Sequence, residues 1–203
     1  EGEGRPVLLL HGEPTWAYLY RKLIPPLAQV GRVIAPDYFG FGRSDKPTQI
    51  GDYSYTLHYN SIERLVDELD LVDVTIVVHD WGGPIGLRLA VERPDRVERL
   101  VILNTGIGAG RAPSDEWLRF RDFVRRVGTD LVPGQLIRIS SANELADDVV
   151  AGYDAPFPTP ESKAGVLAFP EHVPTELDHP NAQAMLEVRA ALERWEKPAL
   201  VLF

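Results

Sequence analysis

The chain has 203 residues, of which 44% are hydrophobic and 25% are charged, and this balance excludes a disordered or collagen-like chain. Its 30 acidic and 21 basic residues give a net charge of −9, which argues against a generic nucleic-acid binder and against binding to anionic membranes. The lack of cysteine excludes thiol catalysis and metal sites held by cysteine. No apolar run approaches the roughly 20 residues that a membrane helix needs.

Short apolar runs alternate with longer amphipathic segments in the first half of the chain. The run Val74–Val78 is β-branched almost throughout and apolar on both faces, which indicates a central strand of a parallel sheet. Asp52 or Ser54 is placed to cap the helix that follows them. The pattern predicts strands at 7–10, 33–35, 74–78 and 97–103, and helices at 16–29, 56–69 and 84–92.

The pattern changes at Gly106. Residues 106–114 are rich in glycine, proline and alanine, and residues 115–179 predict short helices without a strand. A long helix at 181–195 and a strand at 199–203 follow. We therefore predict an α/β protein with a mostly parallel sheet. Residues 1–104 would form the N-terminal part of its core, 105–180 an inserted helical cap, and 181–203 a return to the core.

Both ends of the chain are expected to be truncated. A strand follows the polar segment Glu1–Gly4 almost at once, and the final apolar residues predict the start of a strand with nothing after it. Glu1–Gly4 does not resemble a signal peptide, so we expect a cytoplasmic protein, with any preceding targeting segment left open.

The segment Val78-His-Asp-Trp-Gly-Gly83 carries the sharpest chemical signal. A buried strand ends there, a polar residue follows, and small residues let a helix begin, which is the pattern of a nucleophile elbow. The residue at the tip is Asp80, whose carboxylate is ionised at pH 7 and needs no base to act as a nucleophile. The alternative is an aspartate that only caps the helix.

A second motif, Leu10-His-Gly-Glu-Pro-Thr-Trp16, follows the first predicted strand. In folds with an elbow, this loop supplies one backbone N–H of an oxyanion hole, and the residue after the nucleophile supplies the other. The two donors would be Glu13 and Trp81. Taken alone, the motif also fits an ordinary turn between a strand and a helix.

At these motifs the chain resembles the haloalkane dehalogenases of the α/β-hydrolase superfamily. Glu13 and Asn104 resemble the subfamily that takes its catalytic acid from after the seventh strand. The resemblance covers essentially the whole chain, in the family's order: His11–Trp16, Ala35–Asp37, Gly40–Pro47, His79–Gly83 and Tyr153–Pro158.

The resemblance implies that Asp80 displaces halide from a haloalkane and forms an alkyl ester. A water activated by histidine would then hydrolyse the ester, while the Glu13 and Trp81 N–H groups hold the oxyanion. The Trp81 indole would donate to the halide. The implied partners are a small apolar halogenated substrate, halide and water, with no metal, organic cofactor, nucleic acid or membrane. We expect a monomer.

The chain departs from the family pattern on the first helix of the insertion. The family's second halide-binding tryptophan aligns with Phe120, whereas Trp117 lies three residues earlier on the same helix face. We expect Trp117 to bind halide, with simple packing as the alternative. Phe120, Phe157 and Pro158 are expected to line the substrate pocket.

The family's catalytic acid and histidine would lie beyond Phe203. His172 and His179 lack the motif context of a catalytic base. An epoxide hydrolase is the nearest alternative, although Val78 replaces its usual glycine and Tyr153 is the only tyrosine in the insertion. A non-catalytic fragment or ligand-binding protein is the second alternative.

Overall fold

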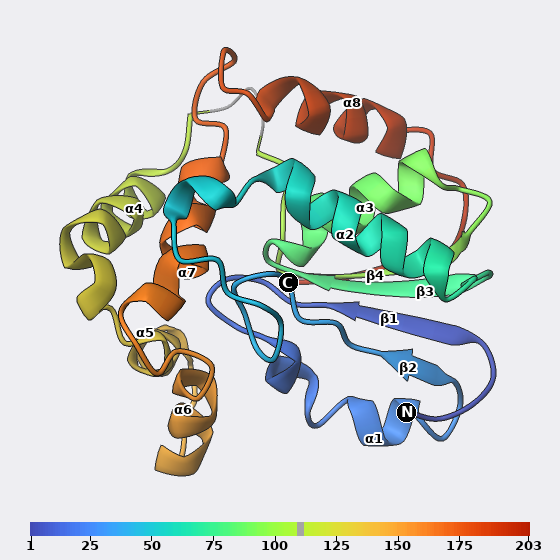
Figure 1. Cartoon of the computed structure of the whole chain (residues 1–203). Coiled ribbons are helices and arrows are strands. Elements are labelled where there is room, and N and C mark those ends of the chain that lie inside the picture. Colours follow the sequence, from blue (N-terminus) through green and yellow to red (C-terminus); the bar gives the residue numbers. More distant parts are fainter. Residues whose placement is uncertain (109–111) are drawn as a thin grey trace.

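The computed structural model describes residues 1–108 and 112–203 and contains one parallel sheet (Figure 1). Its five strands lie in the order β2-β1-β3-β4-β5, and each neighbouring pair is parallel. The predicted parallel α/β sheet is therefore confirmed. The strands are β1 (Pro6–Leu10), β2 (Arg32–Ile34), β3 (Val74–His79), β4 (Val97–Leu103) and β5 (Ala199–Leu202).

Alternating side chains of the central strands build a core on each face of the sheet. Leu8, Leu10 and Ile76 pack on one face, and Leu9 and Val77 on the other, because successive strand residues point in opposite directions. In Figure 1, α2 (Tyr55–Glu68), α3 (Gly82–Glu92) and α8 (Ala182–Leu192) cover the first face, and η1 (Ala17–Tyr20) and α1 (Ile24–Leu27) cover the second.

The helix predicted for residues 16–29 is wrong. The chain forms the short 3-10 helix η1 and then the single turn α1, with a break between them. Pro25 and Pro26 lie in α1 and have no backbone N–H, so neither can donate the helical hydrogen bond that would continue the helix from the preceding turn. Farther along the chain, Ser54 caps α2 by accepting a hydrogen bond from the Leu57 N–H at 3.0 Å.

Helices of the insertion gather at the carboxyl ends of the strands (Figure 1). The structure assigns no strand to residues 112–179, as predicted. The predicted start of the cap at residue 105 stays a prediction, and residues 109–111 lie outside the described residues. The elements are α4 (Asp115–Val127), η3 (Gly128–Asp130), α5 (Pro133–Ser140), α6 (Asp147–Asp154), η4 (Glu161–Lys163), α7 (Ala164–Ala168) and η5 (Phe169–His172), with η2 (Ile50–Asp52) in the core.

The loop after β1 is attached directly to the cap. The Trp16 indole N–H donates to the Gly152 carbonyl oxygen of α6 at 3.1 Å. Tyr18 contacts Tyr153 edge-on, with 5.3 Å between ring centroids. Within the cap, the Arg125 guanidinium donates to both carboxylate oxygens of Glu171 and so joins α4 to η5.

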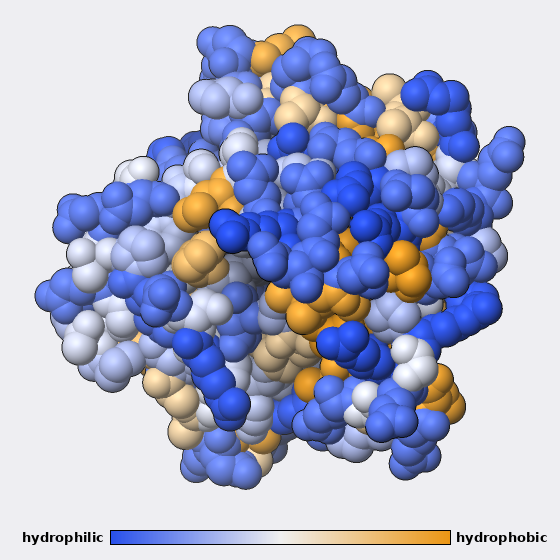
Figure 2. All heavy atoms as spheres, turned by 45° about the vertical axis from the view of Figure 1, so that its right-hand side comes forward, coloured by the Kyte–Doolittle hydropathy of each residue, from blue (hydrophilic) through white to orange (hydrophobic). Residues whose placement is uncertain are grey.

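The molecular surface is mostly hydrophilic on the face that Figure 2 shows, with separate groups of hydrophobic side chains between the polar ones. On β5, the Leu200, Val201 and Leu202 side chains are each about half exposed. None of the helices in the described ranges combines the length and the apolar character that crossing a membrane requires.

Glycine at position 82 is required by the close approach of α3 to β1. A Cβ atom on Gly82 would lie 2.1 Å from the Leu10 carbonyl oxygen. We expect Gly82→Ala to lower the free energy of unfolding by about 1–3 kcal/mol, because backbone atoms would have to move apart. Urea unfolding measures the effect.

Gly51→Ala is the matched control, because a Cβ atom there would meet no atom within 4 Å. Its free energy of unfolding should stay within about 0.5 kcal/mol of the parent value. Equal effects of the two substitutions would contradict the close-packing argument.

Candidate active site

Asp80 lies at the turn between β3 and α3 with a backbone φ of 49°. This left-handed conformation is strained for a residue other than glycine, and such strain concentrates at functional sites. Two donors hold the turn at the Asp80 carbonyl oxygen: the Gly83 N–H at 2.8 Å and the Thr105 hydroxyl at 2.6 Å. The geometry is that of a strand–turn–helix elbow that presents the Asp80 side chain.

The loop after β1 approaches the same carboxylate. The Glu13 N–H donates to Asp80 Oδ1 at 2.8 Å. The Trp81 backbone N–H also lowers the pKa of the carboxyl and so favours its charged form. A Cβ atom on Gly12 would lie 2.3 Å from the Asp80 Cβ, so only glycine permits this approach. The structure thus brings together Asp80 and the two predicted N–H donors, while their role as an oxyanion hole stays a prediction.

Two partly buried carboxyl groups, those of Asp80 and Glu13, lie near each other in this site. Burial raises the pKa of Asp80 above its ordinary value, and hydrogen bonds from the Trp81 and Glu13 N–H groups oppose this rise. Burial, together with the negative charge of Asp80, raises the pKa of Glu13 well above its usual range. Glu13 Oε1 has no hydrogen-bond partner among the described residues. The two N–H donors therefore favour the negative charge on Asp80.

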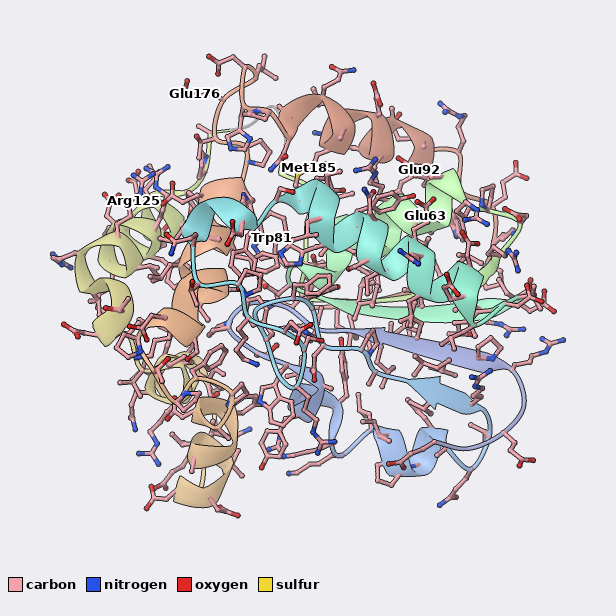
Figure 3. The ribbon with its side chains drawn as sticks, viewed as in Figure 1. Glu63, Trp81, Glu92, Arg125, Glu176 and Met185 are labelled. Atoms are coloured by element: carbon pink, nitrogen blue, oxygen red, sulfur yellow. The ribbon has the colours of Figure 1, made fainter. Side chains whose placement is uncertain are left out.

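A cavity of about 430 Å³ opens beside Asp80. Figure 3 shows Trp81 at the start of α3 and Met185 on α8, and both belong to its walls. Trp117 of α4, predicted from the sequence, also lies in the wall. The lining residues are Asp80, Trp81, Pro84, Thr105, Gly106, Ile107, Gly108, Trp117, Val173, Pro174 and Met185.

The predicted pocket residues Phe120, Phe157 and Pro158 do not belong to the walls of this cavity, and their role in a substrate pocket stays a prediction. Phe120 packs against the main core cluster, and Phe157 is buried there with its ring edge-on to Phe41. Pro158 is exposed on the loop after α6. Apolar character and motif membership could not distinguish core packing from lining the cavity.

Several residues of the cavity wall were not identified from the sequence. Thr105 follows β4, and the pairing of His79 with Leu103 brings the ends of β3 and β4 together. Met185 belongs to the buried face of α8, with Ala182 and Val188 three residues away on either side. That helical spacing was the available signal, although it indicates burial without indicating a cavity. Val173 and Pro174 come from the irregular segment after η5.

None of the five histidines belongs to the cavity walls, although His172 contacts the wall residue Trp81. His11 and His58 are fully buried, and burial lowers the pKa of His58 to about 3. Burial lowers the pKa of His172 to about 4, and its ring lies edge-on to Trp81 at 6.3 Å. His179 Nε2 contacts the Glu171 carbonyl oxygen at 3.0 Å. Across the described ranges, no group of three or more potential ligands could hold a metal ion.

The cap tyrosine that an epoxide hydrolase would need is directed elsewhere. Tyr153 is buried in α6, and its hydroxyl accepts a hydrogen bond from Arg21 at 3.3 Å. It does not belong to the walls of the cavity beside Asp80.

The Thr105 hydroxyl is expected to stabilise the elbow. We expect Thr105→Val to lower the free energy of unfolding by about 1 kcal/mol, because the Asp80 carbonyl oxygen loses one of its two donors. Thr105→Ser keeps the hydroxyl and should stay closer to the parent protein. Chemical denaturation compares the three proteins, and an equal loss in both variants would refute the assigned hydrogen bond.

Comparison with known proteins places the chain in a family. A family model described as the alpha/beta hydrolase fold matches residues 5–138. Haloalkane dehalogenase 1 of Mycobacterium tuberculosis is 48% identical over 201 residues, which are 98% of this chain and 66% of that protein. The haloalkane dehalogenase of Mycolicibacterium paratuberculosis is 47% identical over 203 residues, 99% of this chain and 67% of that protein.

Solved structures of haloalkane dehalogenases also resemble this chain. The tetrameric haloalkane dehalogenase DpaA from Paraglaciecola agarilytica superposes with a TM-score of 0.91 at 35% identity, covering 99% of this chain and 69% of that one. The chain spans about two thirds of the length of the relatives it matches. By sequence and by structure, the chain belongs to the α/β-hydrolase superfamily and, within it, to the haloalkane dehalogenase family.

Proposed function

We propose that the whole protein containing this chain hydrolyses haloalkanes to an alcohol and halide through an ester on Asp80. One observation carries the proposal: a carboxylate at a strained elbow faces a cavity and accepts a hydrogen bond from the Glu13 N–H at 2.8 Å. A carboxylate needs no base to attack carbon, so this geometry suits a displacement. We propose no metal or organic cofactor for the reaction.

In the first step, a carboxylate oxygen of Asp80 forms a bond to the halogen-bearing carbon. The carbon–halogen bond breaks, and halide leaves with the bonding electron pair. An ionised carboxylate in a site with apolar walls is poorly solvated, and so is the departing halide. We assign the Trp81 indole as one halide donor, because Trp81 lies in the wall directly after the nucleophile.

In the second step, water adds to the carbonyl carbon of the Asp80 ester. The negative charge that develops on the ester oxygen would be held by the Glu13 N–H, which already hydrogen-bonds this carboxylate, and by the Trp81 N–H, which favours its charged form. Collapse then releases the alcohol and restores the Asp80 carboxylate. We propose that a histidine outside these 203 residues takes the proton from water, with an acid partner also outside them.

The second halide donor is assigned to Trp117. Its side chain belongs to the wall that contains Asp80 and Trp81, whereas Phe120 lies outside that wall. The Arg121 guanidinium lies 5.4 Å from the Trp117 ring, which adds a cation–π contact on the same helix. An indole N–H joins a polar donor to an apolar body, and this combination suits an anion leaving an apolar substrate.

The nucleophile assignment predicts halide release that depends on Asp80. The whole protein should release bromide and an alcohol from 1-bromobutane, while Asp80→Asn should release none and should show no ester by intact-protein mass spectrometry. Epoxide opening without halide release would overturn the proposal in favour of an epoxide hydrolase. A well-folded protein that catalyses neither reaction would indicate a binding protein.

The pH dependence of ester formation follows from the environment of Asp80. Only the ionised carboxylate attacks, and burial raises its pKa, so the rate should fall with decreasing pH at values above the ordinary aspartate pKa of about 3.9. Rapid-quench mass spectrometry gives the single-turnover rate at each pH. An acid limb at or below the ordinary value would contradict the assigned environment.

Trp117 is expected to contribute to halide affinity. Trp117→Phe removes the indole N–H and should weaken bromide binding about tenfold or more, since a hydrogen bond to a charged group contributes about 1.5–3 kcal/mol. Product inhibition by bromide measures the affinity. Phe120→Leu is the control, because Phe120 lies outside the cavity wall and the substitution should leave the inhibition constant nearly unchanged.

A further inference from the structure

We propose that His11 and Thr15 are positioning residues that hold the peptide between Gly12 and Glu13, so that its N–H is aimed at Asp80. The proposal rests on the proposed ester mechanism, in which this N–H belongs to the oxyanion hole. Both side chains act from outside the cavity wall, through the carbonyl end of one peptide unit. Neither residue contacts the reacting atoms.

Three donors converge on the Gly12 carbonyl oxygen. His11 Nδ1 lies 2.9 Å from it, the Thr15 hydroxyl donates at 2.9 Å, and the Thr15 N–H donates at 3.0 Å. The Glu13 N–H belongs to the same peptide unit as this carbonyl and donates to Asp80 Oδ1 at 2.8 Å. One peptide therefore joins a cluster of donors to the candidate nucleophile.

The surroundings of His11 fix its tautomer. The Tyr38 N–H donates to His11 Nε2 at 3.1 Å, so Nε2 carries the lone pair and Nδ1 carries the proton. The Nδ1–H group then donates to the Gly12 carbonyl oxygen. His11 is fully buried, and burial lowers its pKa to about 4, so the neutral imidazole persists at neutral pH.

Thr15 holds Gly12 from both sides. Its hydroxyl oxygen accepts from the Gly12 N–H at 3.3 Å and donates to the Gly12 carbonyl oxygen at 2.9 Å. The side chain is buried, with 6% of its surface exposed. Because these bonds close a short turn around Gly12, the hydroxyl fixes the rotation of the peptide that follows.

The geometry of the peptide bond transmits this restraint. The bond is planar, so donors that fix the direction of the carbonyl also fix the opposite direction of the N–H. Hydrogen bonds accepted by the carbonyl polarise the peptide and make its N–H a stronger donor. His11 and Thr15 thus orient and strengthen the Glu13 N–H without contacting Asp80.

Ester formation and ester hydrolysis should respond differently to the loss of His11 or Thr15. During ester formation, the Asp80 carboxylate loses negative charge, so a strong N–H donor gives little assistance. During ester hydrolysis, negative charge returns to an oxygen of Asp80, and the N–H becomes a transition-state interaction. Loss of the positioning residues should slow ester hydrolysis more than ester formation.

Thr15→Val and Thr15→Ser test the hydroxyl in the whole protein. Single-turnover mass spectrometry with 1-bromobutane follows the formation and decay of the Asp80 ester. We expect Thr15→Val to slow ester decay about 3- to 10-fold, the range of one lost hydrogen bond, and to change ester formation less than twofold. Thr15→Ser should restore the decay rate. Equal slowing of both steps, or no rescue by serine, would overturn the proposal.

A matched pair tests the two nitrogens of His11 separately. In His11→Asn, the amide nitrogen occupies the position of Nδ1 and keeps a donor for the Gly12 carbonyl oxygen. In His11→Gln, the amide reaches the position of Nε2 and keeps only the acceptor for Tyr38. Ester decay should be faster in His11→Asn than in His11→Gln. The reverse order would assign His11 a packing role only.

A spectroscopic readout separates this proposal from the proposed function. The Glu13 amide proton should shift upfield and exchange faster with solvent in Thr15→Val than in the parent protein or Thr15→Ser, as measured by NMR. An unchanged Glu13 amide would overturn the positioning role. If the parent protein forms no ester while the amide responds as expected, the proposed function fails and the positioning role stands.

Discussion

The hydrogen bond from the Glu13 N–H to Asp80 Oδ1 joins two loops that lie 67 residues apart in the chain. Its length of 2.8 Å requires β1 and β3 to be neighbours, because each loop leaves the carboxyl end of its own strand. It also requires glycine at position 12, where a Cβ atom would overlap the Asp80 side chain. This one contact thus depends on the order of the strands, on the sequence of the loop and on the glycine at position 12. The candidate site is a product of the parallel sheet itself.

Burial makes this hydrogen bond important for the charge on Asp80. A carboxylate taken out of water is destabilised, and the pKa of Asp80 rises accordingly. The Trp81 and Glu13 N–H groups replace part of the stabilisation that water would give the carboxylate. Because they belong to the backbone, they cannot reorient as water molecules do. The nearby Glu13 side chain receives no such pair of donors. The two carboxyl groups therefore differ: hydrogen-bond donors oppose the rise in the pKa of Asp80, whereas burial and the negative charge of Asp80 both raise the pKa of Glu13.

The sequence was informative where local chemistry determines structure. The β-branched run at residues 74–78 predicted a central strand, and the glycines after Asp80 predicted a turn into a helix. It was less informative where packing decides, because the apolar character of Phe157 does not tell a core position from a cavity wall, and the structure buries this side chain in the core. Thr105 and Met185 could not be found from motifs, because they reach the cavity only through strand pairing and helix docking.

The hydrogen bond from Trp16 to Gly152 connects α6 to the loop that contacts Asp80. Trp16 and Glu13 belong to the same short loop. The loop therefore contacts α6 through the Trp16 side chain and Asp80 through the Glu13 N–H. A displacement of α6 would pull on this loop and disturb the donor.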